Sequence, residues 1–149
     1  MSEFLTLLPP DEARALLLSH LAGPLPDSVS IDSFQALGRV LASDVSAPHP
    51  LPEFPRSSVD GYAVRASDTF GASESLPAYL TLIGEIPMGA PADLSLAPAQ
   101  CALIHTGGML PAGADAAAML EYSQAADKTE IEIFRAVAVG ENVISIGED

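Results

Sequence analysis

The sequence predicts a mainly β protein: a complex fold of short, bent, mostly antiparallel sheets, with an N-terminal helix and a short second helix. Three observations favour this class. Short apolar runs divided by Gly, Pro and Asp fill the region after Ala47. One helical pattern with clear start and stop signals precedes them. Hydrophobic residues make up 48% of the chain and charged residues 17%, which is typical of a folded domain.

The first expected element is a helix from Asp11 to Leu21. The stretch Pro9-Pro10-Asp11-Glu12 places prolines and acidic residues where a helix begins, and these residues suit the first turn and the positive end of the helix dipole. Leucines follow on one side, and Gly23-Pro24 supplies the stop signal.

A second, shorter helical segment is expected between Ile31 and Ala42. Ser33 is the candidate N-cap, and Phe34, Leu37 and Leu41 follow at helical spacing.

Four prolines between Ala47 and Pro55 exclude a helix and a central strand there, so this stretch is predicted to be extended and to mark a domain boundary. The predicted organisation is therefore an N-terminal helical segment at 1–26, the start of an elongated domain at 27–46 and a β-rich domain at 47–149.

The β-rich domain is expected to contain five strands. They are Gly61–Ala66, Tyr79–Ile86, Cys101–Thr106, Ala116–Tyr122 and Thr129–Val139. The last two should form a hairpin around a polar turn at Gln124–Lys128, because apolar Ile131 and Ile133 alternate with acidic residues in the final strand.

Charge and composition restrict the function. Six Lys plus Arg against 20 Asp plus Glu give a formal charge of −14, so nucleic acid is excluded as a partner. The start lacks a basic leader, no apolar run approaches the roughly 20 residues that span a bilayer, and one cysteine, Cys101, suits a reducing compartment. These features predict a soluble cytoplasmic protein. The three histidines are scattered, which argues against a metal triad.

Two short motifs carry polar groups next to apolar strands. Asp60-Gly61 is a turn signal, in which Gly accepts a positive φ, and its acid also has the chemistry to hold a metal or a phosphate-bound water. Thr106-Gly107-Gly108 follows an apolar strand, and such loops let backbone N–H groups approach an anion. An ordinary turn remains the alternative for each motif.

Four ordered blocks resemble the molybdopterin molybdenumtransferase family, which includes bacterial MoeA and the E domain of gephyrin. The blocks are Ala36–Ala42, Phe54–Ala66, Thr106–Ala116 and Gly140–Val143 with Gly147–Asp149. The resemblance implies an enzyme of molybdenum cofactor biosynthesis that inserts molybdate into adenylylated molybdopterin and releases AMP with the help of Mg²⁺. It also implies a homodimer whose site lies between the β-rich domain and the molybdopterin-binding α/β domain of the partner subunit. Only the first part of such a protein is expected here, and on its own it should be inactive.

The resemblance also implies roles for particular residues. Asp60 matches the functional aspartate of the family's Asp-Gly-Tyr/Phe motif, and Thr106 matches the threonine of its Thr-Gly loop; these two are the catalytic candidates. The candidates for the substrate-binding site are Ser57, Ser58, Gly107, Glu148 and Asp149. The metal ligands are left open.

One departure from the family motivates a second hypothesis. Many members carry arginines just before Gly-Glu-Asp, whereas this chain has Ile144-Ser145-Ile146. The alternative function is therefore a diverged, non-catalytic scaffold or dimerisation module of the same fold. A third hypothesis is a free-standing β module that binds a peptide along an open strand edge.

Overall fold

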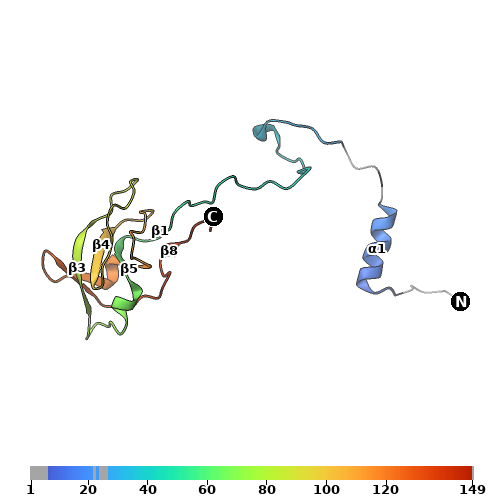
Figure 1. Cartoon of the computed structure of the whole chain (residues 1–149). Coiled ribbons are helices and arrows are strands. Elements are labelled where there is room, and N and C mark those ends of the chain that lie inside the picture. Colours follow the sequence, from blue (N-terminus) through green and yellow to red (C-terminus); the bar gives the residue numbers. More distant parts are fainter. Residues whose placement is uncertain (1–6, 22, 24–26, 149) are drawn as a thin grey trace. The chain divides into compact units, whose positions relative to one another are not determined.

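The computed structural model describes residues 7–21, 23 and 27–148. The chain divides into two units, residues 1–46 and 47–149, each of which is described by itself (Figure 1). The predicted boundary between residues 26 and 27 adjoins positions outside the described residues. No helix in the described part of the chain is long and apolar enough to cross a membrane.

The first unit contains the predicted N-terminal helix. Helix α1 spans Pro10–His20, so the helix begins and ends one residue earlier than predicted. Proline occupies its first turn together with Asp11 and Glu12, and the His20 ring lies 2.8 Å from the Leu16 carbonyl oxygen. Pro24, half of the predicted stop signal, lies outside the described residues. No residue of α1 is buried.

The predicted second helical segment is present, but it is shorter than expected and has a different cap. Only one 3₁₀ turn, η1 at Ser33–Gln35, forms between residues 31 and 42, and its cap is Asp32, whose carboxylate accepts the Phe34 N–H at 2.9 Å, rather than Ser33. The physical reason is that short helices depend on burial of an apolar face. Here Phe34 is 96% exposed, and Gly38 has a φ of 80°, outside helical geometry.

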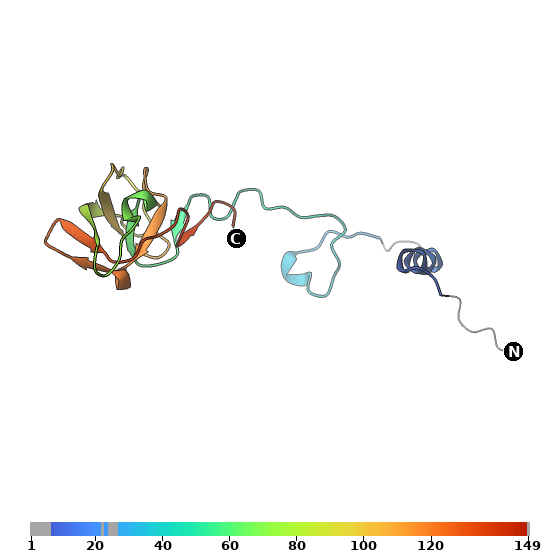
Figure 2. The same cartoon turned by 90° about the horizontal axis from the view of Figure 1, so that it is seen from below.

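The second unit is the predicted mainly β fold, and Figure 2 shows its curled sheet from a second direction. Six strands form the main sheet in the order β5-β2-β4-β3-β7-β6. Their bounds are β2 Gly61–Val64, β3 Ala78–Glu85, β4 Gln100–Ile104, β5 Ala116–Met119, β6 Ser123–Ala125 and β7 Glu130–Ile133. Neighbours are antiparallel except β3 and β4, which are parallel. The remaining 3₁₀ turns are η2 Ala66–Thr69 and η3 Leu120–Tyr122.

The predicted C-terminal hairpin was wrong in its partner strand and in the position of its turn. Residues 120–122 leave the strand as η3, and the new strand β6 occupies Ser123–Ala125, which includes the first two residues of the predicted turn. β6 pairs with β7 through Ala125 opposite Ile131, and Asp127 closes the turn by accepting the Thr129 N–H at 2.6 Å. The last strand also ends at Ile133, six residues earlier than predicted.

Apolar residues cover both faces of the central strands. Adjacent residues of β2, Ala63 and Val64, belong to different core clusters, as do Cys101 and Ala102 of β4. Since successive side chains of a strand point to opposite faces, the middle of the sheet is buried on both sides. These strands therefore appear in the sequence as continuous apolar runs.

Two further strands form a small separate sheet. β1, Arg56–Ser57, pairs antiparallel with β8, Val143–Ile144, and Figure 2 shows the two side by side. The turn before β8 is fixed to the main sheet, because the Asn142 side chain donates to the Ala117 carbonyl at 2.8 Å. The Asn142 carbonyl in turn accepts the Ser58 N–H at 2.9 Å. The segment leading into β2 is thus held from two sides.

The register of β2 determines where the polar motifs meet. Gly61, the first residue of β2, lies opposite Ile104, the last residue of β4. The interpretation of Gly61 as a positive-φ turn residue was wrong, since it has extended strand geometry. Glycine is needed for a different reason: a Cβ at this position would collide with the Ala118 carbonyl of β5.

We therefore expect Gly61→Ala to lower the free energy of unfolding by about 1–3 kcal/mol, because the added methyl group forces β2 and β5 apart. Urea unfolding followed by circular dichroism measures this change. Gly23→Ala is the matched control, since a Cβ at Gly23 meets no atom within 4 Å. Equal stability of the two variants would contradict the close approach of the strands.

A buried hydroxyl joins η2 to the segment after β7. Thr69 is fully buried, and its Oγ1 donates to the Ala66 carbonyl at 2.8 Å and accepts the Val137 N–H at 3.0 Å. We expect Thr69→Val to cost about 1–3 kcal/mol of unfolding free energy, because two buried backbone groups lose their partner. Thr81→Val on the exposed side of β3 is the control, expected to change stability by less than about 0.5 kcal/mol. A similar loss in both variants would argue against this role of the hydroxyl.

Candidate functional site

Asp60 and Thr106 lie together because of the strand register. Asp60 directly precedes β2, and Thr106 is the second residue after β4. Because β2 and β4 are antiparallel neighbours, the start of β2 lies beside the end of β4. Asp60 Oδ1 accepts the Thr106 N–H at 2.8 Å and the Thr106 hydroxyl at 3.3 Å. The Asp60 side chain is 58% exposed. Both of these donors bind the same carboxylate oxygen, Oδ1.

The Thr106-Gly107-Gly108 loop does not present its N–H groups to an anion. Thr106 donates to Asp60, Gly107 donates to the Ser57 carbonyl at 2.7 Å, and Gly108 donates to the His105 carbonyl at 2.8 Å. Gly107 has a φ of 82°, as expected of a glycine in this loop. Because all three donors are used within the fold, the expectation of an anion cradle is not met in this structure.

The two serines before Asp60 have different environments. Ser57 is fully buried, and its hydroxyl donates to the Val59 carbonyl at 2.7 Å. Ser58 is exposed, and its backbone N–H is held by Asn142. Ser57 therefore shapes the backbone that delivers Asp60, whereas the Ser58 hydroxyl faces solvent. Their assignment to the substrate site stays a prediction.

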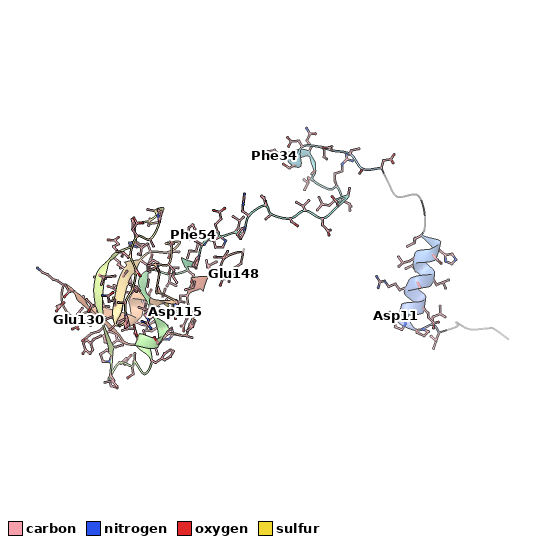
Figure 3. The ribbon with its side chains drawn as sticks, viewed as in Figure 1. Asp11, Phe34, Phe54, Asp115, Glu130 and Glu148 are labelled. Carbon is pink, nitrogen blue, oxygen red and sulfur yellow. The ribbon has the colours of Figure 1, made fainter. Side chains whose placement is uncertain are left out.

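Glu148 closes a turn of its own. Its Oε2 accepts the Ser145 N–H at 2.6 Å, and Gly147 donates to the Pro52 carbonyl at 3.1 Å. Figure 3 labels Glu148 at the end of the β unit where β8 lies. In the described part of the chain, no hydrogen bond joins Glu148 to Asp60 or Thr106. Asp149, its predicted neighbour in the site, lies outside the described residues.

The structure adds two residues that sequence reasoning missed. His105 Nε2 lies 2.9 Å from Glu85 Oε1, and His105 Nδ1 lies 3.8 Å from Asp60 Oδ1. The ring is 35% exposed and the Glu85 side chain 59%. The sequence signal was His105 itself, directly before Thr106, together with Gly84, because a glycine inside a strand pattern indicates a bulge.

Two arginines of the second unit form ion pairs with carboxylates other than Asp60. Arg65 is 3.9 Å from Asp68, and Arg135 is 2.7 Å from Glu141. Arg56 lies on β1 directly opposite Ile144 of β8, the stretch in which many family members carry arginines. The site is thus acidic in character, with the His105 ring between Asp60 and Glu85.

The described residues do not form a metal site by themselves. No group of three or more His, Cys, Asp or Glu side chains in this part of the chain has the arrangement to hold a metal ion. The implied Mg²⁺ therefore does not fit these residues alone. A shallow hollow of about 210 Å³ lies beside the loop, lined by Phe54, Gly89, Ala90, Pro91, Gly107 and Met109. Asp60 is not among its lining residues, so the carboxylate faces open solvent rather than a closed cavity.

Cys101 is not a nucleophile in this fold. It is fully buried on β4, and burial raises the pKa of its thiol from 9.0 to about 12. The reactive thiolate is therefore suppressed at neutral pH.

We expect the Cys101 thiol to react with a thiol reagent at pH 8 only as fast as the protein unfolds. The stabilisation from the neutral thiol is fully present below pH 9. It is lost as the pH rises to about 12, because the unfolded chain releases this proton first. A smaller pH slope of unfolding free energy in Cys101→Ala over this range confirms the effect. Rapid labelling of the folded protein at pH 8 would contradict the expected protection of the Cys101 thiol.

The mixed β-sheet carries an exposed carboxylate, a hydroxyl and an imidazole at one end. Comparison with known proteins identifies the domain that this sheet forms. The family model for the MoeA N-terminal region (domains I and II) matches residues 8–149. The chain belongs to this family.

Individual relatives support this family assignment. The chain is 37% identical over 152 residues to a molybdopterin molybdenumtransferase of Bacillus subtilis, covering 100% of this chain and 35% of that protein. It is 37% identical over 121 residues to molybdopterin molybdenumtransferase 2 of Mycobacterium tuberculosis, covering 81% of this chain and 30% of that protein. A crystal structure of a molybdopterin biosynthesis MoeA protein from Pyrococcus horikoshii superposes with a TM-score of 0.79 at 38% identity, covering 97% of this chain and 37% of that one. The chain thus spans about a third of the length of these relatives.

Proposed function

We propose that this chain supplies one part of the active site of a molybdopterin molybdenumtransferase, in which molybdate is inserted into adenylylated molybdopterin and AMP is released. The observation that carries the proposal is the Asp60–Thr106 pair. One carboxylate oxygen is bound by the loop, on a side chain that is largely exposed.

The pair is suited to orienting a substrate through hydrogen bonds. Thr106 fixes the carboxylate, so Asp60 offers it at a defined position without further loss of side-chain freedom. Both substrates are anions, so a carboxylate contacts them through a hydrogen-bond donor, such as a water molecule held between them. The residues that bind the phosphate groups are proposed to come from the molybdopterin-binding α/β domain of a partner subunit in a cytoplasmic homodimer. Alone, this chain is proposed to be inactive.

The proposal agrees with the acidic character of the site. The formal charge of −14 disfavours binding of an anionic substrate to this chain alone, and the loop N–H groups are already used within the fold. A site completed by a second, more basic surface removes both difficulties. Mg²⁺ is expected to require ligands beyond the described residues.

A chimaera tests the role of Asp60. In it, this chain replaces the matching region of the Bacillus subtilis relative. All of this chain aligns with 35% of that relative, at 37% identity. Molybdate-dependent release of AMP from adenylylated molybdopterin is measured. We expect Asp60→Ala and Asp60→Asn to lower kcat by about 100-fold, since misplacing a bound substrate by about 1 Å has an effect of this size.

Asp44→Asn, at an exposed position of the first unit, is the control and is expected to retain full activity. Full activity of Asp60→Ala would end the proposed role of that residue. A folded chimaera that releases no AMP, beside an active Bacillus subtilis enzyme, would instead favour the non-catalytic scaffold. The specific observation behind that alternative is Ile144-Ser145-Ile146 in place of arginines. If the chimaera does not fold, the same assay is made with this chain and the remaining region of the relative mixed as separate proteins.

A further inference from the structure

We propose that His105 is a positioning residue for Asp60 and that Glu85 anchors the His105 ring. This inference rests on the proposed function of Asp60. It assigns a task to two side chains that the sequence motifs of the site do not include.

The sheet topology brings these residues together from three neighbouring strands. β3 and β4 run parallel, so Glu85 at the end of β3 lies beside the end of β4, with Leu103 as its partner in the register. His105 follows β4 directly, and Asp60 precedes the antiparallel neighbour β2. All three side chains therefore belong to the same end of the β3-β4-β2 portion of the sheet.

A bulge in β3 controls the face on which Glu85 lies. Leu82 pairs with Cys101 and Glu85 pairs with Leu103, so β3 carries one residue more than β4 over this interval. Ile83 and Ile86, three residues apart, consequently pack against the same core cluster. In regular alternation, position 85 would share the face of Ile83. The bulge near Gly84 removes Glu85 from that face and leaves its side chain 59% exposed.

The contacts of His105 are suited to orienting the Asp60 carboxylate. Glu85 Oε1, 2.9 Å from Nε2, fixes the ring plane, and Nδ1 then lies 3.8 Å from Asp60 Oδ1. Both donors of Thr106 approach this same oxygen. Oδ1 of Asp60 is thus the oxygen that faces both the loop and the ring.

Spectroscopy on the 149-residue chain tests the coupling without any substrate. We expect Glu85→Gln to shift the Asp60 carboxyl-carbon resonance, although residue 85 lies 25 positions away, because the effect passes through the ring. His105→Ala should cause a larger shift, and Glu74→Gln, at an exposed turn, should cause none. An unchanged Asp60 resonance in both site variants overturns the inference.

Kinetics of the chimaera test the consequence for the reaction. We expect His105→Ala to lower kcat about 10-fold with KM changed less than about twofold, and to have no further effect in the Asp60→Ala background, because both changes act on one group. His105→Asn should recover several-fold, since its amide nitrogen takes the place of Nδ1, and His49→Ala should be silent. Loss of kcat in Asp60→Ala with none in His105→Ala overturns this inference alone. A silent Asp60→Ala overturns the proposed function instead.

Discussion

The pairing of β2 between β4 and β5 is the constraint on which the site depends. Gly61 lies opposite Ile104 on one side and close to the Ala118 carbonyl on the other, an approach that leaves no room for a side chain. Asp60 and Thr106 flank this pair of positions, so they meet wherever the register holds. A slip of β2 by one residue would also move Ala63 and Val64 to the wrong core clusters. The hydrophobic pattern that stabilises the sheet therefore also positions the carboxylate.

The polar groups at this end of the sheet fall into two sets: backbone groups that stabilise the fold, and side chains that stay exposed. The loop after β4 uses its N–H groups to bind Asp60, Ser57 and His105, so its backbone is a support and not an anion receptor. What remains exposed is acidic or titratable. In a chain of charge −14, such a surface complements a basic one better than it binds a phosphate ester. This character agrees with a site that is completed by another domain.

Sequence patterns predicted the parts of this structure that local chemistry controls. The proline signal of α1 and the apolar runs of β2 to β5 follow from residue type and motif. The failures share one cause, which is dependence on distant partners. The segment 31–42 has helical spacing but no buried face, and β6 forms only because β7 offers it a partner. His105 was set aside because the histidines are scattered, whereas its partners come from β2 and β3. Neither the parallel pairing nor the bulge of β3 has a strong local signal.

Asp60 stabilises the loop after β4 by accepting the Thr106 N–H and hydroxyl, as a purely structural carboxylate would. Asp115 is a useful comparison within the same sheet. Its Oδ1 accepts the Ala66 N–H at 2.6 Å, and its own N–H donates to the Val64 carbonyl, in a half-buried position where a structural carboxylate is expected. Asp60 accepts a backbone N–H in a similar way but is 58% exposed, with the Thr106 hydroxyl and a histidine ring beside the same oxygen. This exposure leaves the Asp60 carboxylate accessible to a ligand, in contrast to the half-buried Asp115.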